Sequence, residues 1–330
     1  MTKRIIALIL ALAAAAVLLA GCELRLGPEQ GIDIPTLPEL SPEDLALLSK
    51  LNEDGDDDAL NRALLGLLPP GFTLAADQEH ALQPNMLPEG EAADKAELLK
   101  LVKKVQDTFN SGTFYLKGRG NNMMDSGGGS YAPMTLAVDQ DKMMIETDFD
   151  WGNMMKTAYQ EQGEADVGQS KLQASIAQTL LGSKMRMLYV DNTVYMLYPE
   201  KKRAANLSAF AEGEDGLDGI SPNEMINTFD QFGSKLADEN DLKATRVKDG
   251  KNEYLCATYT VDEDELGRTT MKYYFLKGEL KRLEVASEQG NSVFEIDTFS
   301  GRVDSSLFST KGYAQLNMGD MAKLTGLLNF

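Results

Sequence analysis

The residue types that most often carry enzyme chemistry are scarce in this chain. Its 330 residues include one histidine, His80, and two cysteines, Cys22 and Cys256. A Ser-His-Asp or Cys-His catalytic device needs its histidine inside a folded domain, but His80 lies in a segment that contains prolines. One histidine and a free cysteine also provide too few ligands for a zinc site. We therefore predict that the protein is not an enzyme and holds no metal and no cofactor.

An acidic run around Gly55, residues 52–58, invites comparison with a calcium-binding EF-hand loop. With Gly55 at the sixth position of such a loop, Lys50 falls at the first position and Asn61 at the twelfth. An EF-hand has an aspartate and a bidentate glutamate at those two positions. The mismatch favours a solvated loop, and calcium binding by this run stays an open alternative.

The N-terminal segment has the layout of a secretory signal. Lys3 and Arg4 supply positive charge, and the 16 residues from Ile5 to Ala20 are apolar without interruption. Small residues then precede the cysteine in the sequence Leu19-Ala20-Gly21-Cys22. An uncleaved transmembrane anchor is the alternative, but a membrane-spanning helix needs about 20 apolar residues.

This ending resembles the lipobox of bacterial lipoproteins. The resemblance implies that the Cys22 sulfur carries a diacylglycerol and that the peptide bond before Cys22 is cut. The new N-terminus is often acylated as well, for example with palmitate. Residues 1–21 would then be a lipoprotein signal peptide, and Cys22 the first residue of the mature chain. The resemblance also implies an extracytoplasmic location in the cell envelope, with the protein lipid-anchored to a membrane.

The chain is strongly acidic, with a net charge of −19 that becomes −21 when Lys3 and Arg4 leave with the signal peptide. Because nucleic-acid affinity depends on neutralising phosphates with basic residues, we predict no nucleic-acid partner. Charge alone would also not hold the protein at an anionic membrane surface. The N-terminal lipid is therefore the predicted membrane contact, and the sequence points to no particular protein partner.

Prolines and acidic residues set the segment after the cysteine apart from the rest. Four prolines between residues 23 and 42 suggest an extended tether, and Ser41-Pro42-Glu43-Asp44 can open a short helix. A second short helix is expected over 59–68. We interpret residues 22–90 as a lipid-anchored, acidic, Pro-rich stalk that adds little to the fold, and 91–330 as the main domain.

The main domain begins with a helix and then changes to a strand period. The opening helix is predicted from one apolar stripe, formed by Leu98, Val102, Val105 and Phe109. Further helices are expected over 171–181 with Gly182 as its cap, over 222–236 after a capping box, and over 318–328. About eleven strands are expected: 113–120, 131–138, 142–149, 185–190, 193–198, 202–207, 242–248, 252–261, 269–276, 279–287 and 292–299.

The short links between these strands predict the fold class. Tight connections require antiparallel pairing, and eleven strands exceed what one flat sheet carries comfortably, so the sheet should curl. We therefore predict an α+β fold. It is a curled antiparallel sheet of about eleven strands, an unclosed half-barrel, with helices covering its concave face.

The order of elements, the lipidated N-terminus and the tail resemble the LolA/LolB-like superfamily, which also holds lipoproteins of the LppX/LprG kind. The tail match consists of Phe294–Phe299 and Ser306–Tyr313, a last strand followed by a "Phe…Gly-Tyr" segment. The resemblance covers about residues 91–330. It implies an unclosed β-barrel capped by helices, with an apolar cavity that takes acyl chains. Residues 23–90 are an insertion that departs from the family pattern.

Methionine is unusually abundant, with 16 in the chain. Because methionine is flexible and polarizable, it suits adaptable apolar surfaces, although ordinary core filling is the alternative. We predict an apolar cavity between the curled sheet and the helices 171–181 and 222–236, with its mouth near Trp151. The candidate lining residues are Trp151, Met154, Met155, Leu172, Ile176, Leu180, Met225, Phe229 and Phe232.

The predicted function is non-enzymatic binding of a lipid, a lipoprotein acyl chain or another hydrophobic molecule. The alternative is a structural or interaction lipoprotein whose core is filled by its own side chains. Cys256 adds no catalytic possibility. It lies in the apolar, strand-like run Tyr254-Leu255-Cys256-Ala257, where we interpret it as a small buried hydrophobe.

Overall fold

The computed structural model describes residues 41–54, 57–75, 83–121, 131–155, 167–207, 242–263, 267–287, 290–316 and 320. The predicted signal peptide, Cys22, His80 and the helix predicted over 222–236 lie outside the described residues. The helix predicted over 318–328 also lies outside them, apart from Asp320. Within the described ranges, no helix combines the length and the apolar character needed to cross a bilayer.

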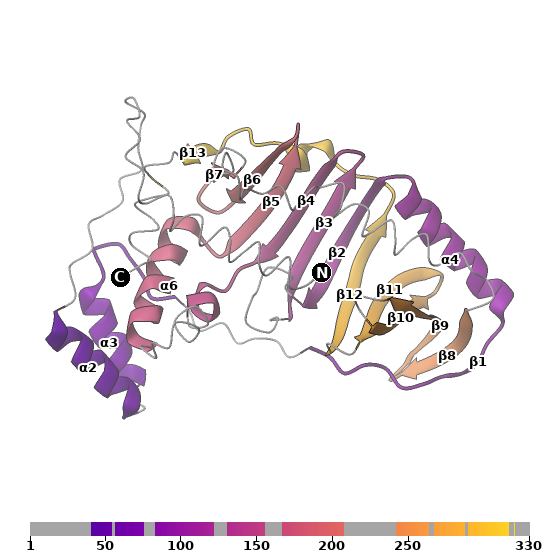
Figure 1. The fold of residues 1–330 in the computed structure, drawn as a ribbon, viewed down its shortest axis with the longest axis horizontal. Coiled ribbons are helices and arrows are strands. Elements are labelled where there is room, and N and C mark those ends of the chain that lie inside the picture. Colours follow the sequence, from indigo (N-terminus) through magenta and orange to yellow (C-terminus); the bar gives the residue numbers. More distant parts are fainter. Residues whose placement is uncertain are drawn as a thin grey trace.

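One continuous sheet of thirteen strands forms the body of the described structure (Figure 1). The strands pair antiparallel throughout, except that β13 runs parallel to β7. In spatial order the strands are β1 (Glu91–Ala92), β8 (Lys243–Asp249), β9 (Asn252–Glu263), β10 (Gly267–Leu276), β11 (Glu279–Ser287), β12 (Gly290–Ser300), β2 (Thr113–Asn121), β3 (Tyr131–Asp139), β4 (Lys142–Asp148), β5 (Lys184–Val190), β6 (Thr193–Tyr198), β7 (Arg203–Asn206) and β13 (Ala314–Leu316).

The eleven predicted strands are all present, and the two additional ones are the edge strands β1 and β13. They have two and three residues, which is too short for side-chain alternation to reveal them. The order of the strands is linear, with β1 at one edge and β13 at the other, so the sheet is unclosed. The predicted α+β class and unclosed sheet are confirmed, and the strand count is corrected to thirteen in the described residues.

Two irregularities in strand pairing help the sheet to curl. The register shifts at Tyr274/Phe275, between β10 and β11, and again at Ile296/Thr298, between β12 and β2. A bulge bends its strand and increases the local right-handed twist. Figure 1 shows the resulting turn of strand direction from the β5–β7 end to the β8–β11 end.

The helices α4 (Lys95–Asn110) and α6 (Val167–Leu181) confirm two of the predicted helices. The side chain of Asp94 caps α4 by accepting a hydrogen bond from the Ala96 amide at 2.8 Å. At the end of α6, Gly182 has φ +86° and donates its amide to the Gln178 carbonyl. The predicted apolar stripe of α4 is buried, and its members are Leu98, Val102, Val105 and Phe109.

Alternation of side chains divides the sheet into two faces. We define the inner face as the one whose side chains form a single large buried cluster with side chains of α4 and α6. The outer face carries two smaller clusters. One surrounds Met144 and Leu188 and includes Phe308, from the short 3-10 helix η5 (Ser305–Phe308). The other surrounds Cys256 and Tyr274. Helices therefore cover the inner face, whereas irregular segments cover parts of the outer face.

Residues before the predicted domain boundary pack onto the body of the protein. The helices α2 (Pro42–Glu53) and α3 (Asp57–Leu67) lie beside α6 (Figure 1). The Ala75 amide donates a hydrogen bond of 2.8 Å to the buried Ser175 hydroxyl of α6. Three leucines of α2 and α3 belong to the same buried cluster as the inner face: Leu48, Leu60 and Leu64. These contacts differ from the expectation that residues 23–90 add little to the fold.

A second early segment crosses the outer face, and we call residues 83–90 the strap. Leu87 of the strap packs in the outer cluster around Cys256 and Tyr274. The Leu87 amide donates a hydrogen bond of 2.8 Å to the buried Glu284 carboxylate of β11. The strap therefore packs against the sheet, although its sequence contains prolines. The division of the chain at residue 91 stays a prediction that limited proteolysis can test.

The acidic run 52–58 differs from the expected solvated loop. Its first two residues, Asn52 and Glu53, end α2, and Asp57 and Asp58 begin α3. Only residues 54–56 separate the two helices, whereas an EF-hand loop has twelve residues. Among the residues that the structure describes, no group of three or more His, Cys, Asp or Glu side chains is placed to hold a metal ion.

Candidate ligand site on the inner face of the sheet

The structure brings most of the predicted lining residues into one cluster. Those from the short helix 151–155 and from α6 are buried in the inner-face cluster or packed against it: Trp151, Met154, Met155, Leu172, Ile176 and Leu180. Met225, Phe229 and Phe232 lie outside the described residues. Contact of any of these side chains with a ligand stays a prediction.

Trp151 is fixed against the end of α6. Its indole nitrogen donates a hydrogen bond of 2.7 Å to the Gly182 carbonyl. Its ring meets the Phe149 ring edge to face, with 4.7 Å between the ring centroids. The indole is also buried. The connection from β4 into the helical region is therefore held in place at the same end of α6 as the glycine cap.

Methionines from adjacent strands line the inner face between β3 and β6. Met187 of β5 lies directly opposite Met196 of β6, and Ile145 of β4 lies on the other side of Met187. The inner-face methionines in this part of the sheet are Met134, Met143, Met185, Met187 and Met196. Because thioether side chains adapt their shape, this region can accommodate apolar groups of different outline.

The neighbouring pair Met143 and Met144 shows how alternation sorts these side chains. Met143 belongs to the inner cluster, whereas Met144 belongs to the outer cluster with Leu188. Successive residues of a strand point to opposite faces, so adjacent methionines cannot serve one site.

Tyrosine hydroxyls on the inner face remain uncharged. Burial raises the pKa of Tyr198 to about 12, and burial also raises the pKa values of Tyr259 and Tyr273. The rings of Tyr259 and Tyr273 meet edge to face, with their centroids 6.1 Å apart. At neutral pH, these buried inner-face tyrosines therefore carry no charge.

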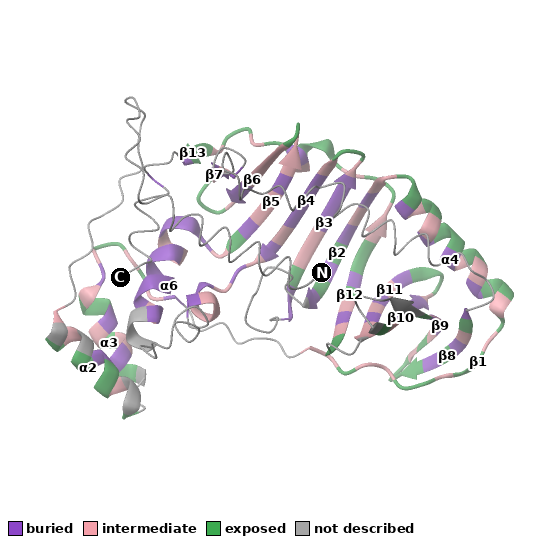
Figure 2. Cartoon of the chain, viewed as in Figure 1, coloured by how far each residue is buried: buried purple, intermediate pink, exposed green. Residues whose placement is uncertain are grey.

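The helix α6 is buried on most of its sides, and three of its polar residues, Ser170, Gln173 and Ser175, are buried as well. Figure 2 shows α6 mostly buried, whereas α4 alternates between buried and exposed residues. Ser175 is satisfied, because it accepts the Ala75 amide and donates to the Lys171 carbonyl at 2.7 Å. Gln173 is completely buried. The sequence analysis missed Gln173 because a glutamine between apolar residues of a helix is normally solvent-facing.

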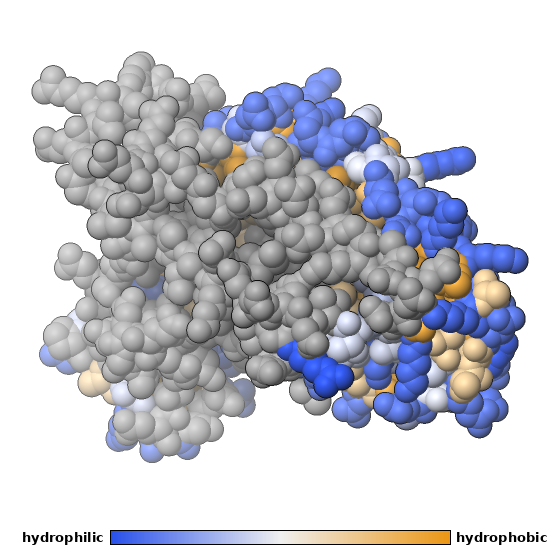
Figure 3. Space-filling model, turned by 45° about the vertical axis from the view of Figure 1, so that its right-hand side comes forward, coloured by the Kyte–Doolittle hydropathy of each residue, from blue (hydrophilic) through white to orange (hydrophobic). Residues whose placement is uncertain are grey.

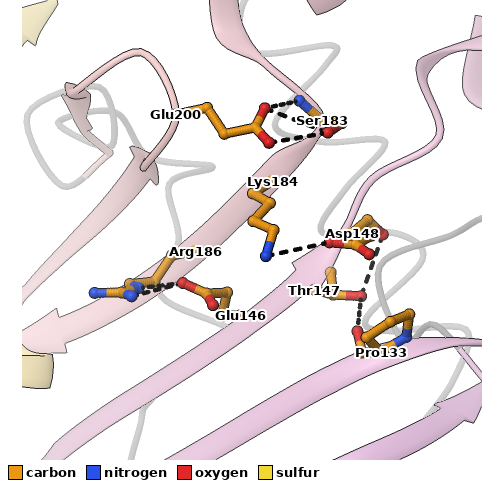
Figure 4. A network of polar contacts seen from close by, with 8 residues as sticks. All are labelled: Pro133, Glu146, Thr147, Asp148, Ser183, Lys184, Arg186 and Glu200. Atoms are coloured by element: carbon orange, nitrogen blue, oxygen red, sulfur yellow. Dashed lines mark hydrogen bonds and ion pairs between the residues drawn. The ribbon is translucent and has the colours of Figure 1, made fainter.

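The outer face of β4 and β5 is held by polar pairs across the strands (Figure 4). Arg186 donates two hydrogen bonds to Glu146, at 2.9 and 2.6 Å, and Lys184 approaches Asp148 at 4.0 Å. Both pairs are register neighbours. Burial raises the pKa of Asp148, and Lys184 opposes this shift. These groups have partners within the sheet, so we assign them a structural role.

A second polar network of the outer face is buried beneath the strap. Glu284 accepts hydrogen bonds from the Tyr274 hydroxyl at 2.7 Å and the Arg282 guanidinium at 2.8 Å. Arg282 also donates to the Asn85 carbonyl of the strap. Beside this network, the Tyr131 hydroxyl donates to Glu295. The network joins strands β10 to β12 to residues 83–90, so it also serves the fold.

Two hollows in the described surface lie away from the inner face. One, of about 480 Å³, lies against the exposed side of α4, where the visible surface is mainly hydrophilic (Figure 3). Its lining includes Lys100, Lys103, Lys104 and Asp107. The other, of about 30 Å³, lies beneath the strap beside Cys256. Cys256 is buried, as predicted, and burial raises its thiol pKa, which disfavours the reactive thiolate.

Comparison with known proteins gives only remote similarities. No family model matches the chain, and no curated protein matches it. Similar solved structures include LprF from Mycobacterium bovis, with 10% identity, a TM-score of 0.36, and coverage of 65% of this chain and 97% of that one. Lipoprotein LppX from Mycobacterium tuberculosis has 9% identity, a TM-score of 0.34, and coverage of 64% and 99%.

A LolA superfamily protein from Nitrosomonas europaea is also similar, with 8% identity, a TM-score of 0.22, and coverage of 66% of this chain and 98% of that one. With identities of 10% or less and TM-scores below 0.5, these likenesses establish neither a family nor an activity for this chain.

Proposed function

We propose that this chain is a cell-envelope lipoprotein that binds a lipid, an acyl chain or another hydrophobic molecule on the inner face of its sheet, without enzymatic activity. The observation that carries the proposal is the contiguous apolar cluster of that face. It extends from Leu316 on β13 to Leu255 on β9 and includes side chains of α4 and α6. An acyl chain is the ligand class that such a surface suits.

The energetics favour a long apolar ligand over a small polar one. Each methylene removed from water contributes about 0.8 kcal/mol, so an acyl chain gains affinity with length. The methionines between β3 and β6 can adjust to the chain's outline. The buried tyrosines stay neutral, so they add no ionic requirement. A hydrophobic ligand therefore needs no charged counterpart on this face.

The proposed attachment to a membrane rests on the sequence Leu19-Ala20-Gly21-Cys22. Thioether attachment at Cys22 is the proposed sorting step, after which the mature chain is held by its acyl groups. We expect Cys22→Ala to leave an uncleaved, unacylated precursor. Mature-size protein that still partitions into detergent would contradict the lipoprotein assignment, as judged by immunoblotting and intact-mass measurement.

The lipid-binding proposal is tested with the full chain purified from membranes. We expect an organic extract of the protein to contain a lipid at near-stoichiometric amounts by mass spectrometry. Removal of that lipid should lower the melting temperature, because a ligand that binds only the native state stabilises it. An extract without lipid, together with no saturable uptake of a fluorescent acyl probe, would exclude the proposal.

A structural lipoprotein without a ligand is the second candidate, and close packing of the described core favours it. The Phe109 and Phe114 rings, for example, meet edge to face with their centroids 4.9 Å apart. Such packing leaves part of the inner face filled by the protein itself. Under this alternative, the purified and the delipidated chains melt at the same temperature, and uptake of acyl probes does not saturate.

A further inference from the structure

Within the described residues of α6, two polar side chains, Gln173 and Thr179, have buried atoms without a hydrogen-bond partner, and Gln173 is the one that is completely buried. Gln173 of α6 has 0% exposure, and within the described part of the protein neither its amide nitrogen nor its amide oxygen has a hydrogen-bond partner. Buried side-chain amides are normally hydrogen-bonded, so an unpartnered one requires an explanation. Ser175, two residues further along α6, is fully engaged by contrast.

The phase of the helix places Gln173 among the candidate lining residues. With 3.6 residues per turn, Ile176 and Ala177 follow Gln173 by one turn and Leu180 by two. These three residues are buried in the inner-face cluster. Lys171 and Gln178, which are partly exposed, lie on the other side of α6. The Gln173 amide therefore lies on the buried arc of the helix.

The charges around α6 restrict the kind of group that Gln173 can meet. Lys171 is the one charged residue in the sequence of α6, and two residues along a helix correspond to about 200° of rotation. At the C-terminal end of α6, the Arg203 guanidinium already donates to the Leu180 carbonyl at 3.0 Å. Within the described residues, an ionised ligand group beside Gln173 would therefore be buried without a counter-charge on the same side of α6, which is unfavourable.

We propose that the Gln173 amide is the hydrogen-bonding contact for the uncharged polar end of an acyl ligand, such as an ester, amide or hydroxyl group. The side chain offers one carbonyl acceptor and an amino group with two donors. It can thus pair with a linkage that accepts, donates or does both. The inference rests on the proposed function, and it adds the chemical class of the ligand: a neutral acyl ester, acyl amide or acyl alcohol.

The test compares two glutamines of the same helix in the full chain. Gln173→Met removes the buried amide and retains an apolar side chain of similar length. Gln178→Met makes the same change on the partly exposed side of α6 and is the matched control. Each protein is titrated with a fluorescent acylglycerol ester and with the same chain as a free fatty acid at neutral pH. Its melting temperature is measured without ligand.

We expect Gln173→Met to weaken ester binding about tenfold, since the ligand's polar group loses its partner. Its ligand-free melting temperature should stay equal or rise, because removal of an unpartnered amide costs the fold nothing. Gln178→Met should match the wild type in both measurements. The wild type should also prefer the ester over the ionised acid.

Three results would overturn the inference. Unchanged ester affinity in Gln173→Met would show that the amide does not contact the ligand, while the proposed function would stand. A fall in ligand-free melting temperature with lost binding would assign Gln173 to the fold instead. Tighter binding of the ionised acid than of the ester would exclude the neutral ligand class. If the wild type binds neither probe, the proposed function itself fails, and the inference fails with it.

Discussion

The two faces of the sheet bury polar groups in opposite ways. On the outer face, charged side chains pair with each other. Glu146 pairs with Arg186 across neighbouring strands, and Arg282 pairs with Glu284 of its own strand and with Glu295 of the next strand. On the inner face, the buried cluster of apolar and tyrosine side chains lies beside the uncharged polar residues Gln173 and Ser175 of α6. The difference indicates that charged pairs on the outer face hold the strands and the strap together, and it is on the uncharged inner face that we propose a ligand binds.

Among the substitutions that test this difference between the faces, we expect the largest effect on stability from a substitution of Glu284. Glu284→Ala leaves the buried Arg282 without its closest carboxylate and removes the acceptor for Leu87 of the strap. We expect a loss of about 3–5 kcal/mol in the free energy of unfolding, measured with urea, because breaking a buried ion pair strands the remaining charge. Binding of an acyl probe by the folded variant should be unchanged.

Glu253→Ala is the control for that variant, because Glu253 pairs with Arg246 at 3.1 Å but both side chains are about half exposed. An exposed pair of this kind contributes less than about 1 kcal/mol. Equal losses for Glu284→Ala and Glu253→Ala would contradict a structural role for the buried network. Replacing Arg282 and Glu284 together with apolar residues should cost less than Glu284→Ala alone.

A core truncation on each face separates stability from binding. Ile176→Ala on α6 and Leu188→Ala in the outer cluster each remove a fully buried aliphatic side chain. We expect each to lower the free energy of unfolding by about 2–4 kcal/mol. Only Ile176→Ala should also weaken the binding of an acyl probe, measured by fluorescence titration below the melting temperature. An equal loss of affinity in both variants would remove the distinction between the faces.

Because the inner-face tyrosines are buried in their neutral form, we predict that the protein loses stability at alkaline pH. Burial raises the pKa of Tyr198 to about 12, from 10. Below pH 10 this tyrosine is neutral in both folded and unfolded chains, so its full contribution to stability is present. Between pH 10 and 12 the unfolded chain ionises first, so the wild type should lose about 2–3 kcal/mol through this residue.

The Tyr198→Phe variant should not show this part of the decrease in the free energy of unfolding at alkaline pH, because it has no hydroxyl group to ionise at this position. Urea unfolding of both proteins at about pH 9 and pH 12 measures the difference, because other tyrosines titrate in the same way in both chains. A constant gap between the two proteins across this range would show that Tyr198 ionises normally. The inner face would then accept a charge more readily than we propose.

The smallest expected effect concerns the partly buried pair on the outer face. Glu146 and Arg186 form a two-bond contact with side-chain exposures of 24% and 16%. A double-mutant cycle with alanine should give a coupling of about 0.5–1 kcal/mol that shrinks in about 1 M sodium chloride. The Lys184–Asp148 pair, at 4.0 Å and more exposed, should give a coupling near zero. A larger coupling for Lys184–Asp148 would contradict this order.

Local sequence patterns were sufficient to predict most helices and strands of the described fold. The stripe from Leu98 to Phe109 has helical spacing and is buried as predicted. The hairpin between β5 and β6 turns at Asp191-Asn192, both with positive φ, which is the geometry that such residues tolerate. Each of these signals acts over a few residues, so the sequence alone contains it.

Features that depend on packing between distant segments could not be predicted in the same way. The strap and helices α2 and α3 looked like stalk because their composition contains prolines and acids, yet their buried contacts are with β11 and α6. Gln173 was overlooked for the same reason. Its burial follows from the enclosure of α6 on most of its sides by other segments, and the spacing of residues within α6 does not reveal that enclosure.

The most direct measurement is photoaffinity labelling of the full chain with a diazirine-bearing acylglycerol, followed by mapping of the labelled residues by mass spectrometry. Met143 and Met144 are adjacent in β4 but lie on the inner and outer faces, so they form an internal control. The account predicts labelling of Met143, Met187 and α6 that unlabelled lipid suppresses, with Met144 unlabelled. Suppressible labelling of Met144 and Leu188 instead, or labelling that unlabelled lipid does not reduce, would contradict ligand binding on the inner face.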